Sequence, residues 1–192
     1  QEESTEFDLN LNYGIGIIDL TLGYFSNSID NLINRDKKGE PYYNIGKSLI
    51  SGGEVTVKLR YWKFCLTSNG ELISGVNKSR SGCPNDYIDD LPYIPKYRLY
   101  NSLNINILKS LDIIFEANFI GKTYEYPYDP SFHSNIKTEI PSYNLMNINA
   151  NYRINKMFKF YTRVNNLFDT NYYTETDFPC PGRQIIFGVR LE

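Results

Sequence analysis

Histidine and cysteine are scarce in this sequence, and many catalytic and metal centres are built from these residues. The 192 residues include one histidine, His133, and three cysteines, at positions 65, 83 and 180. A structural zinc site needs about four such ligands, and a Ser-His-Asp triad needs a histidine placed beside its serine. We therefore expect no enzyme, no metal centre and no bound cofactor.

A strong net charge and a long apolar run are also missing. The formal net charge is -2, so the chain offers no broad basic field for nucleic acid. No stretch approaches the roughly 20 apolar residues of a membrane helix, and the mean hydropathy is -0.43. These absences do not exclude a membrane β-barrel, because a barrel strand carries its apolar residues at every second position.

The few cysteines and an acidic stretch leave two structural questions open. Cys83 and Cys180 lie in turn-rich segments, and a disulfide between them is possible in an oxidising compartment. Asp86, Asp89 and Asp90 could offer oxygen ligands to calcium. A solvated acidic loop is the favoured interpretation of these aspartates.

Aromatic residues and strict alternation are abundant. The sequence has 17 tyrosines and 11 phenylalanines, and such rings are favoured in strands and at membrane interfaces. A period of two between apolar positions is the signature of a strand with one apolar and one polar side. The clearest case is the last part of the chain, with its apolar positions at Phe158, Phe160, Thr162 and Val164, then at Ile185, Phe187, Val189 and Leu191.

Nine strand-like runs follow one another along the chain, and no convincing run has helical spacing. They cover approximately residues 6–13, 18–33, 43–62, 64–76, 102–107, 111–119, 147–154, 158–165 and 184–191. The connections between consecutive runs alternate strictly between short and long. The sequence therefore predicts an all-β fold, an antiparallel up-and-down meander of about nine strands.

A meander with short turns at one end and long loops at the other has its two ends in different environments. Outer-membrane barrels are built in this way, with tight periplasmic turns and long extracellular loops. A secreted β-sandwich also alternates apolar and polar residues, so alternation alone does not decide between the two. Sandwiches, however, usually include Greek-key crossovers and shorter strands.

In the barrel interpretation the apolar sides face lipid and the polar sides line the interior. A charge facing lipid near the midplane costs about 2–4 kcal/mol, so charged strand positions must face water or protein. The charged positions expected on the interior side are Lys58, Arg60, Asp112, Glu116, Arg153, Lys159, Arg163 and Arg190.

Nine strands do not make a complete bacterial barrel. Single-chain barrels have an even number of strands, and unpaired edges are not tolerated in lipid. The chain also begins at Gln1, without a Met or a signal peptide. We therefore expect residues 1–192 to be the C-terminal segment of something larger.

Two short motifs flank the last connection of the chain. They are Asn166-Leu167-Phe168-Asp169 and Pro181-Gly182-Arg183. With the terminal strand that follows, they resemble the closing segment of TonB-dependent outer-membrane receptors. One departure is the end of the chain, where the family commonly finishes on an aromatic residue and this sequence has Leu191 and Glu192.

The resemblance implies a 22-stranded barrel in the outer membrane of a Gram-negative-type cell, of which this chain supplies the last nine strands. It also implies three protein partners: the remaining strands, a plug domain inside the barrel, and TonB, which pulls on a box ahead of the plug. Plug and box are absent from these residues. The implied function is energised uptake of a scarce ligand, a ferric siderophore by default and cobalamin or haem as alternatives.

The motif residues from Asn166 to Asp169 and from Pro181 to Arg183 are interpreted as structural, with Arg183 paired to an acidic group on a neighbouring strand or on the plug. Ligand contacts are expected in the long loops. The candidate patch there consists of Tyr124, Tyr126, Tyr128, Phe132 and His133, because aromatic rings and an imidazole suit a bulky organic or metal-chelate ligand. These rings packing the loop onto itself is the alternative.

Two other function classes stay in view. The first is a secreted or surface β-protein that transports nothing, which detergent dependence would separate from a receptor. The second is an outer-membrane hydrolase with His133 as its base. It is disfavoured because the histidine lies in a loop and not beside a strand serine.

Overall fold

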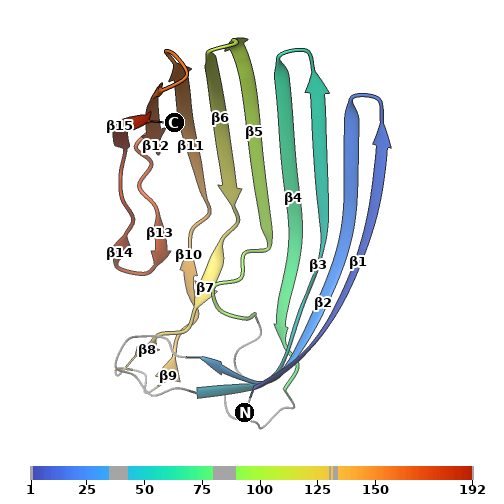
Figure 1. Ribbon diagram of the computed structural model, residues 1–192. Coiled ribbons are helices and arrows are strands. Elements are labelled where there is room, and N and C mark those ends of the chain that lie inside the picture. Colours follow the sequence, from blue (N-terminus) through green and yellow to red (C-terminus); the bar gives the residue numbers. More distant parts are fainter. Residues whose placement is uncertain (1, 35–42, 80–89, 130, 132–133, 192) are drawn as a thin grey trace.

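A single antiparallel sheet forms the body of the computed structural model, which describes residues 2–34, 43–79, 90–129, 131 and 134–191. Within these residues the sheet has nine strands, each paired with its neighbour along the chain (Figure 1). The described residues contain no helix that could span a bilayer. The prediction of an all-β meander of nine strands is confirmed.

The strands of this sheet are 8 to 19 residues long. In spatial order they are β1 (Glu3–Ile15), β2 (Ile18–Asn34), β3 (Tyr43–Tyr61), β4 (Phe64–Asn77), β5 (Tyr97–Leu108), β6 (Leu111–Ile120), β11 (Tyr143–Arg153), β12 (Phe158–Asn165) and β15 (Gln184–Leu191).

Two strands begin four or five residues earlier than their alternation indicated. β5 begins at Tyr97 and β11 at Tyr143. The early part of β5 escaped the sequence prediction because the polar Asn101 interrupts its apolar side. Its side-chain oxygen accepts a hydrogen bond from the Ser68 hydroxyl at 2.8 Å, which satisfies both groups on that side of the sheet.

Three short hairpins lie in the long connections and were not predicted. They pair β7 (Thr123–Glu125) with β10 (Thr138–Ile140), β8 (Tyr128–Asp129) with β9 (Ser134–Asn135), and β13 (Tyr173–Glu175) with β14 (Phe178–Pro179). Strands of two or three residues are too short to show a period of two.

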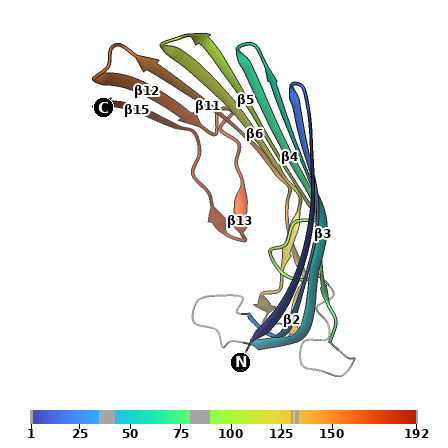
Figure 2. The same ribbon diagram turned by 45° about the vertical axis from the view of Figure 1, so that its right-hand side comes forward.

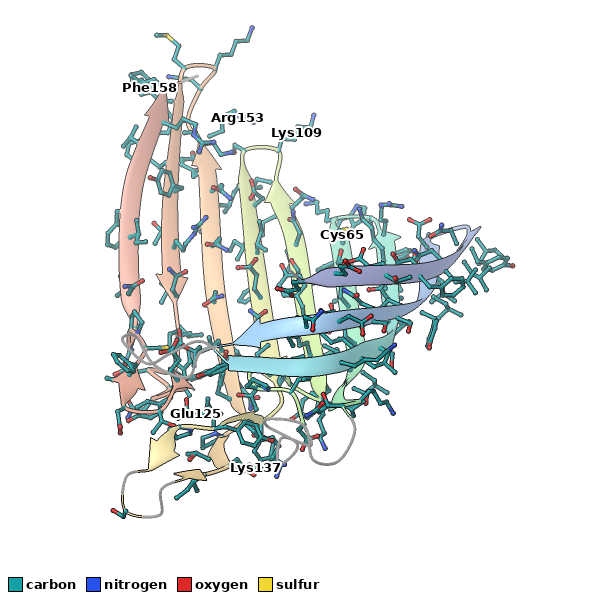
Figure 3. All side chains as sticks on the ribbon, turned by 90° about the horizontal axis from the view of Figure 1, so that it is seen from below. Cys65, Lys109, Glu125, Lys137, Arg153 and Phe158 are labelled. Carbon is teal, nitrogen blue, oxygen red and sulfur yellow. The ribbon has the colours of Figure 1, made fainter. Side chains whose placement is uncertain are left out.

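The tight turns gather at one end of the sheet and the long connections at the other (Figure 1). Two of the tight turns use the left-handed backbone region, at Gly16 with φ of 56° and at Trp62 with φ of 51°. Figure 3 marks the two ends, with Lys109, Arg153 and Phe158 towards the tight turns and Glu125 and Lys137 among the connections. The predicted alternation of short and long connections is therefore confirmed.

The sheet curves, and its two faces differ in chemistry. Strand register places Leu11, Leu22, Val55 and Gly70 side by side on the convex face, with similar residues along the other strands. Figure 2 shows the curvature, with β13 on the concave side. Among the described residues, Ile29, Leu91, Tyr126 and Ile140 are the buried apolar ones. Among the described residues, none covers the convex apolar face.

Polar side chains on the concave face hydrogen-bond across strands. Asn151 donates to Asp112 at 2.8 Å, and Asn149 donates to Glu116 at 3.0 Å. The Tyr100 hydroxyl also donates to Glu116, at 3.0 Å. The charged positions expected on the interior side share this face according to the strand register.

Candidate functional site

A small core joins two of the long connections. Tyr126 is 1% exposed and packs on Leu91, which is 2% exposed. The Tyr126 hydroxyl donates a hydrogen bond to the Asp90 carbonyl at 3.0 Å. Leu32 and Ile50 from β2 and β3 pack against the same cluster. The connections after β4 and after β6 are thereby held against each other and against the sheet.

An ion pair strengthens this junction on its exposed side. The Lys137 ammonium donates to the Asp90 carboxylate at 2.7 Å, and Lys96 lies 3.6 Å from the same group. The hydrogen bond from Lys137 lowers the pKa of Asp90 below its ordinary value and raises the pKa of Lys137 above its own. Lys137 and Lys122 also lie over the Tyr124 ring, at 4.2 and 5.6 Å from its centroid.

The predicted aromatic patch is only partly among the described residues. Tyr126 fills the core between connections, and Tyr124 carries two lysines on its ring. Tyr128 contributes its backbone to β8. Phe132 and His133 lie outside the described residues. Ligand contact by this patch stays a prediction, with Tyr124 as its accessible described member.

The described residues also bear on the calcium site and the disulfide that the sequence left open. The Asp90 carboxylate forms ion pairs with Lys96 and Lys137, whereas Asp86 and Asp89 lie outside the described part. Within that part no three His, Cys, Asp or Glu side chains are placed to hold a metal ion. Cys180 carries a free thiol, and Cys83 lies outside the described residues.

A buried carboxylate joins three connections at one point. Glu125 in β7 is 5% exposed. One of its oxygens accepts hydrogen bonds from the Tyr93 hydroxyl at 3.4 Å and from the Thr176 backbone amide at 3.3 Å. Tyr93 precedes β5 and Thr176 lies between β13 and β14, so one side chain ties together segments from three separate connections.

Beside this junction lies a hollow of about 240 Å³. Tyr93, Tyr143, Tyr173 and Arg98 are among the residues that line it. The Arg98 guanidinium lies 3.7 Å from the Glu71 carboxylate, and the Tyr143 ring packs on Tyr172 with centroids 4.8 Å apart. Aromatic rings stack on the flat groups of an organic ligand, and a guanidinium pairs with its anionic groups, so this lining suits an anionic aromatic ligand.

Sequence reasoning missed this hollow because its lining comes from different connections. Tyr93 lies at the end of one connection and Arg98 at the start of β5 that follows it, Tyr143 closes a second connection and Tyr173 belongs to a third. The sequence signal that could have indicated this hollow is a tyrosine or arginine at a strand boundary beside a long loop.

The two motifs of the closing connection fold into one clamp. Asn166 is buried and has φ of 50°. Its amide nitrogen donates to the Thr170 carbonyl at 2.9 Å and to the Pro181 carbonyl at 3.4 Å. Its amide oxygen accepts from the Thr170 backbone amide at 2.9 Å. One side chain thus closes the turn after β12 and fastens it to the segment just ahead of β15.

Asp169 completes this clamp. Its carboxylate accepts a hydrogen bond from the Arg183 backbone amide at 2.6 Å and lies 4.0 Å from the Arg183 guanidinium. A Cβ at position 182 would lie 2.6 Å from the same carboxylate, which explains the glycine there. The sequence led us to expect an acidic partner for Arg183 on a neighbouring strand or the plug, but its partner is Asp169 in the same connection.

Leu167 and Phe168 have different surroundings within the clamp. The Leu167 backbone amide donates to the Met146 carbonyl on β11 at 2.7 Å. Phe168 is 68% exposed. The motif therefore anchors the connection to the sheet through its backbone at Leu167 and presents an aromatic ring outward at Phe168.

Comparison with known proteins identifies relatives for nearly the whole chain. The family model described as TonB dependent receptor-like, beta-barrel, matches residues 1–167. The ferric enterobactin receptor PfeA of Pseudomonas aeruginosa matches 99% of this chain with a TM-score of 0.78 and 19% identity. The ferric-catecholate import receptor Fiu of E. coli matches 99% with a TM-score of 0.76 and 18% identity.

A third solved structure gives the same picture. The pyoverdine outer membrane receptor FpvA of Pseudomonas aeruginosa, bound to pyoverdine, matches the entire chain with a TM-score of 0.76 and 20% identity. At these identities the likeness shows the fold. The chain spans about a third or less of each of these proteins, covering 31%, 27% and 30% of their lengths.

Proposed function

Because the chain belongs to the TonB-dependent receptor-like β-barrel family, we propose that it forms part of the wall of an outer-membrane receptor. The receptor binds a scarce ligand outside the cell and takes part in its TonB-energised uptake. In this proposal residues 1–192 are the C-terminal nine strands of a 22-stranded barrel. The other strands, the plug domain and the TonB box lie in parts of the protein beyond this sequence.

The family match over residues 1–167 is the observation that carries this proposal. The two-faced sheet supports it. A bilayer would cover the uncovered convex face, and the polar concave face would line the interior, as in known transmembrane barrels. The tight turns then lie on the periplasmic side and the long connections outside the cell. The receptor performs binding and transport without catalysis.

We propose a ferric siderophore as the ligand. The solved relatives include receptors for ferric catecholates, ferric enterobactin and pyoverdine. The hollow lined by Tyr93, Arg98, Tyr143 and Tyr173 lies among the connections that would face outward. Such chelates carry aromatic or anionic groups that rings and a guanidinium bind well. The patch around Tyr124 is a second contact surface in this proposal.

Binding to the full-length receptor tests this function. The purified receptor is titrated with ferric catecholate and pyoverdine-type chelates, haem and cobalamin, and labelled uptake is followed in cells with and without TonB. Arg98→Ala is expected to weaken binding of an anionic chelate about tenfold, which corresponds to about 1.4 kcal/mol. Arg60→Ala is the matched control, because Arg60 also has a carboxylate partner, Asp19 at 2.6 Å, but lies at the tight-turn end of β3.

Each outcome of these experiments is decisive. Binding of haem or cobalamin in place of a siderophore would replace the proposed ligand but keep the receptor function. Uptake that is independent of TonB would overturn the energised mechanism. A protein that stays soluble and monomeric without detergent would overturn the membrane proposal in favour of a secreted β-protein.

A further inference from the structure

Two glycines interrupt the apolar convex face on neighbouring strands. Gly53 lies on β3 and Gly70 on β4, where the register pairs Gly53 with Leu72 and Gly70 with Val55. A glycine inside a strand weakens it, and it often marks a bulge or a site that another molecule approaches closely. The register with the flanking strands is regular at both positions, so neither glycine belongs to a bulge.

Within the described part of the chain, nothing requires a glycine at either position. Neither residue has a positive φ. A Cβ at Gly70 would lie 3.5 Å from Val55 Cγ1, and a Cβ at Gly53 would lie 3.8 Å from the Gly23 carbonyl oxygen, which are ordinary van der Waals distances. An alanine would therefore fit at both positions.

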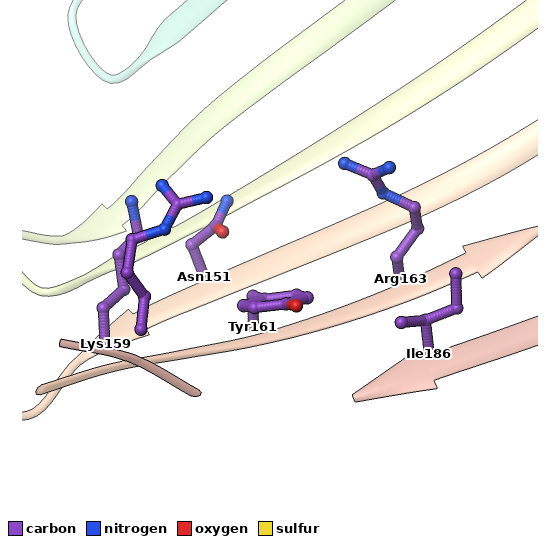
Figure 4. A pocket seen from close by; sticks show the side chains of 6 residues that line it. Asn151, Lys159, Tyr161, Arg163 and Ile186 are labelled. Carbon is purple, nitrogen blue, oxygen red and sulfur yellow. The ribbon is translucent and has the colours of Figure 1, made fainter. Parts of the chain in front are cut away.

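Gly188 on β15 shows the contrast. A Cβ there would collide with the Tyr161 ring of β12. Figure 4 shows this ring between Lys159 and Arg163 in a hollow of the concave face. Gly188 thus makes room for a side chain of the same chain. The two glycines of the convex face make room for no described side chain, so their reason lies outside the described residues.

The missing side chains leave an apolar groove of about 520 Å³. The side chains that border it on the convex face are Leu22, Val55, Leu72, Tyr97 and Leu99. Charged residues alternate with these along the strands, and the register assigns their side chains to the concave face. The groove therefore has apolar walls and a floor of glycine backbone whose polar groups are already paired in the sheet.

A row of serines lies just beyond the groove, two residues further towards the long connections. Register places Ser26, Ser51 and Ser74 side by side on β2, β3 and β4, and Ser51 shares the convex face with Gly53 because alternate residues of a strand point to the same side. A hydroxyl without a hydrogen-bond partner is costly in an apolar medium. Hydrocarbon offers no partner, so we place this row where the ester groups of a bilayer begin.

The length of β3 agrees with this placement. The stretch from Ser51 to Tyr61 is about 33 Å long at about 3.3 Å per residue. A strand tilt of about 40° reduces this to about 25 Å along the bilayer normal, which is the height of the apolar band of transmembrane barrels. The groove begins directly inward of Ser51, so it lies in the leaflet on the side of the long connections.

We propose that this groove is a binding site for one acyl chain of a phospholipid of that leaflet, whose ester carbonyls accept hydrogen bonds from the serine hydroxyls. The inference rests on the proposed function, in which the convex face meets lipid. Lipid contact in general needs no groove, whereas the two glycines provide a fixed place for a single chain. A second copy of the protein fits less well, because two convex faces meet only along a narrow line.

Photolabelling of the full-length receptor in phosphatidylcholine vesicles tests the proposal. A small share of the lipid carries a diazirine in one acyl chain, and labelled residues are mapped by mass spectrometry after illumination. Labelling at Leu72 and Tyr97 is expected to exceed that at Phe115, which lies on the convex face outside the groove, by about tenfold. The double variant Gly53→Val with Gly70→Val fills the groove and should reduce its labelling to the level of Phe115.

Ala150→Val is the matched control. It adds the same apolar side chain to the convex face between Ile113 and Thr162, outside the groove, and should leave the labelling of the groove unchanged. Valine is favoured in strands, so the double valine variant should fold. If it does not, Gly53→Ala with Gly70→Ala takes its place, because a Cβ fits at both positions. Equal labelling of the groove in the filled variant and wild type would overturn the proposal.

The remaining outcomes also decide. Uniform labelling over the convex face would mean ordinary surrounding lipid, and a crosslink between two receptor copies through Leu72 would mean a second copy, and either overturns the proposal. Replacing the three serines by alanine should lower the labelling of the groove, and unchanged labelling would overturn the placement of the ester carbonyls. A receptor that takes up a siderophore but is labelled uniformly overturns this inference alone, whereas a labelled groove in a receptor that binds no chelate overturns only the ligand proposal.

Discussion

At the scale of single residues, the Asn166 side chain holds the closing connection together through several hydrogen bonds. Its amide makes bonds to both ends of the turn, at Thr170 and Pro181, and its backbone adopts the left-handed region at φ of 50°. Asparagine tolerates this region better than most residues. One side chain of the motif thus makes hydrogen bonds to backbone amide and carbonyl groups of this connection.

Replacing Asn166 by alanine should loosen this connection. The loss of its three side-chain hydrogen bonds at about 1 kcal/mol each, with a left-handed alanine costing about 1 kcal/mol, predicts a loss of about 4 kcal/mol in local stability. Hydrogen exchange at the Thr170 amide, which donates to Asn166, measures it. Asn166→Gly should recover only the backbone part, and Phe168→Ala should leave exchange unchanged. Equal exchange in Asn166→Ala and wild type would contradict the assignment.

At the scale of elements, the junction between the connections depends on an ion pair whose pH range follows from its two pKa values. The pKa of Asp90 lies below its ordinary 3.8, so its contribution is complete above about that pH and is lost as the pH falls through the lowered value. The pKa of Lys137 lies above its ordinary 10.5, so its contribution is complete below that pH and is lost as the pH rises through the raised value.

The junction should therefore be equally stable from about pH 4 to pH 10 and weaken outside this window. The Leu91 amide, which donates to the Gly75 carbonyl at 3.0 Å, reports on it by hydrogen exchange corrected for the intrinsic rate. Lys137→Met should speed exchange throughout the window. Lys122→Met is the matched control, because Lys122 contacts the same Tyr124 ring but pairs with Glu139 at 2.7 Å. Equal effects of the two variants would refute the role of the ion pair.

The strands and connections also show which features of the structure could be predicted from the sequence alone. A period of two identifies most strands of the main sheet because one side of each is apolar over several consecutive pairs, whereas β4 is poorly patterned. The same pattern does not tell Tyr124 from Tyr126, which alternate along β7 and the residue after it. Only the packing of Leu91 from another connection buries one of them. The hollow at Arg98 and the Glu125 junction likewise depend on contacts between residues far apart in sequence.

At the scale of the whole molecule, the sheet has an apolar face whose exposure to water is unfavourable. Its convex face carries exposed large apolar residues from β1 to β15, including Leu11, Phe115 and Phe187. A monomeric soluble protein rarely exposes a contiguous patch of this kind. The described sheet also ends in two edge strands, β1 and β15, which need partners in a bilayer because lipid offers no hydrogen bonds.

Two adjacent isoleucines give the sharpest test of which face meets lipid. Ile113 pairs with Ile105 and Ala150 on the convex face, and Ile114 pairs with Asn104 and Asn149 on the concave face. In the full-length receptor, Ile113→Lys should lower the free energy of unfolding from bilayers by about 1 kcal/mol. The cost of a lipid-facing lysine falls from about 2–4 kcal/mol at the midplane to about 0–1 kcal/mol near the interface, and Ile113 lies near a tight turn.

Ile114→Lys should cost much less, because its new charge joins a polar wall that already holds Asp112 and Glu116. Both variants replace the same residue with the same charge one position apart, so β-propensity and side-chain size cancel in the comparison. Equilibrium unfolding from lipid vesicles measures the difference. Equal losses in the two variants would mean that both faces meet the same medium, and the membrane assignment of the convex face would be wrong.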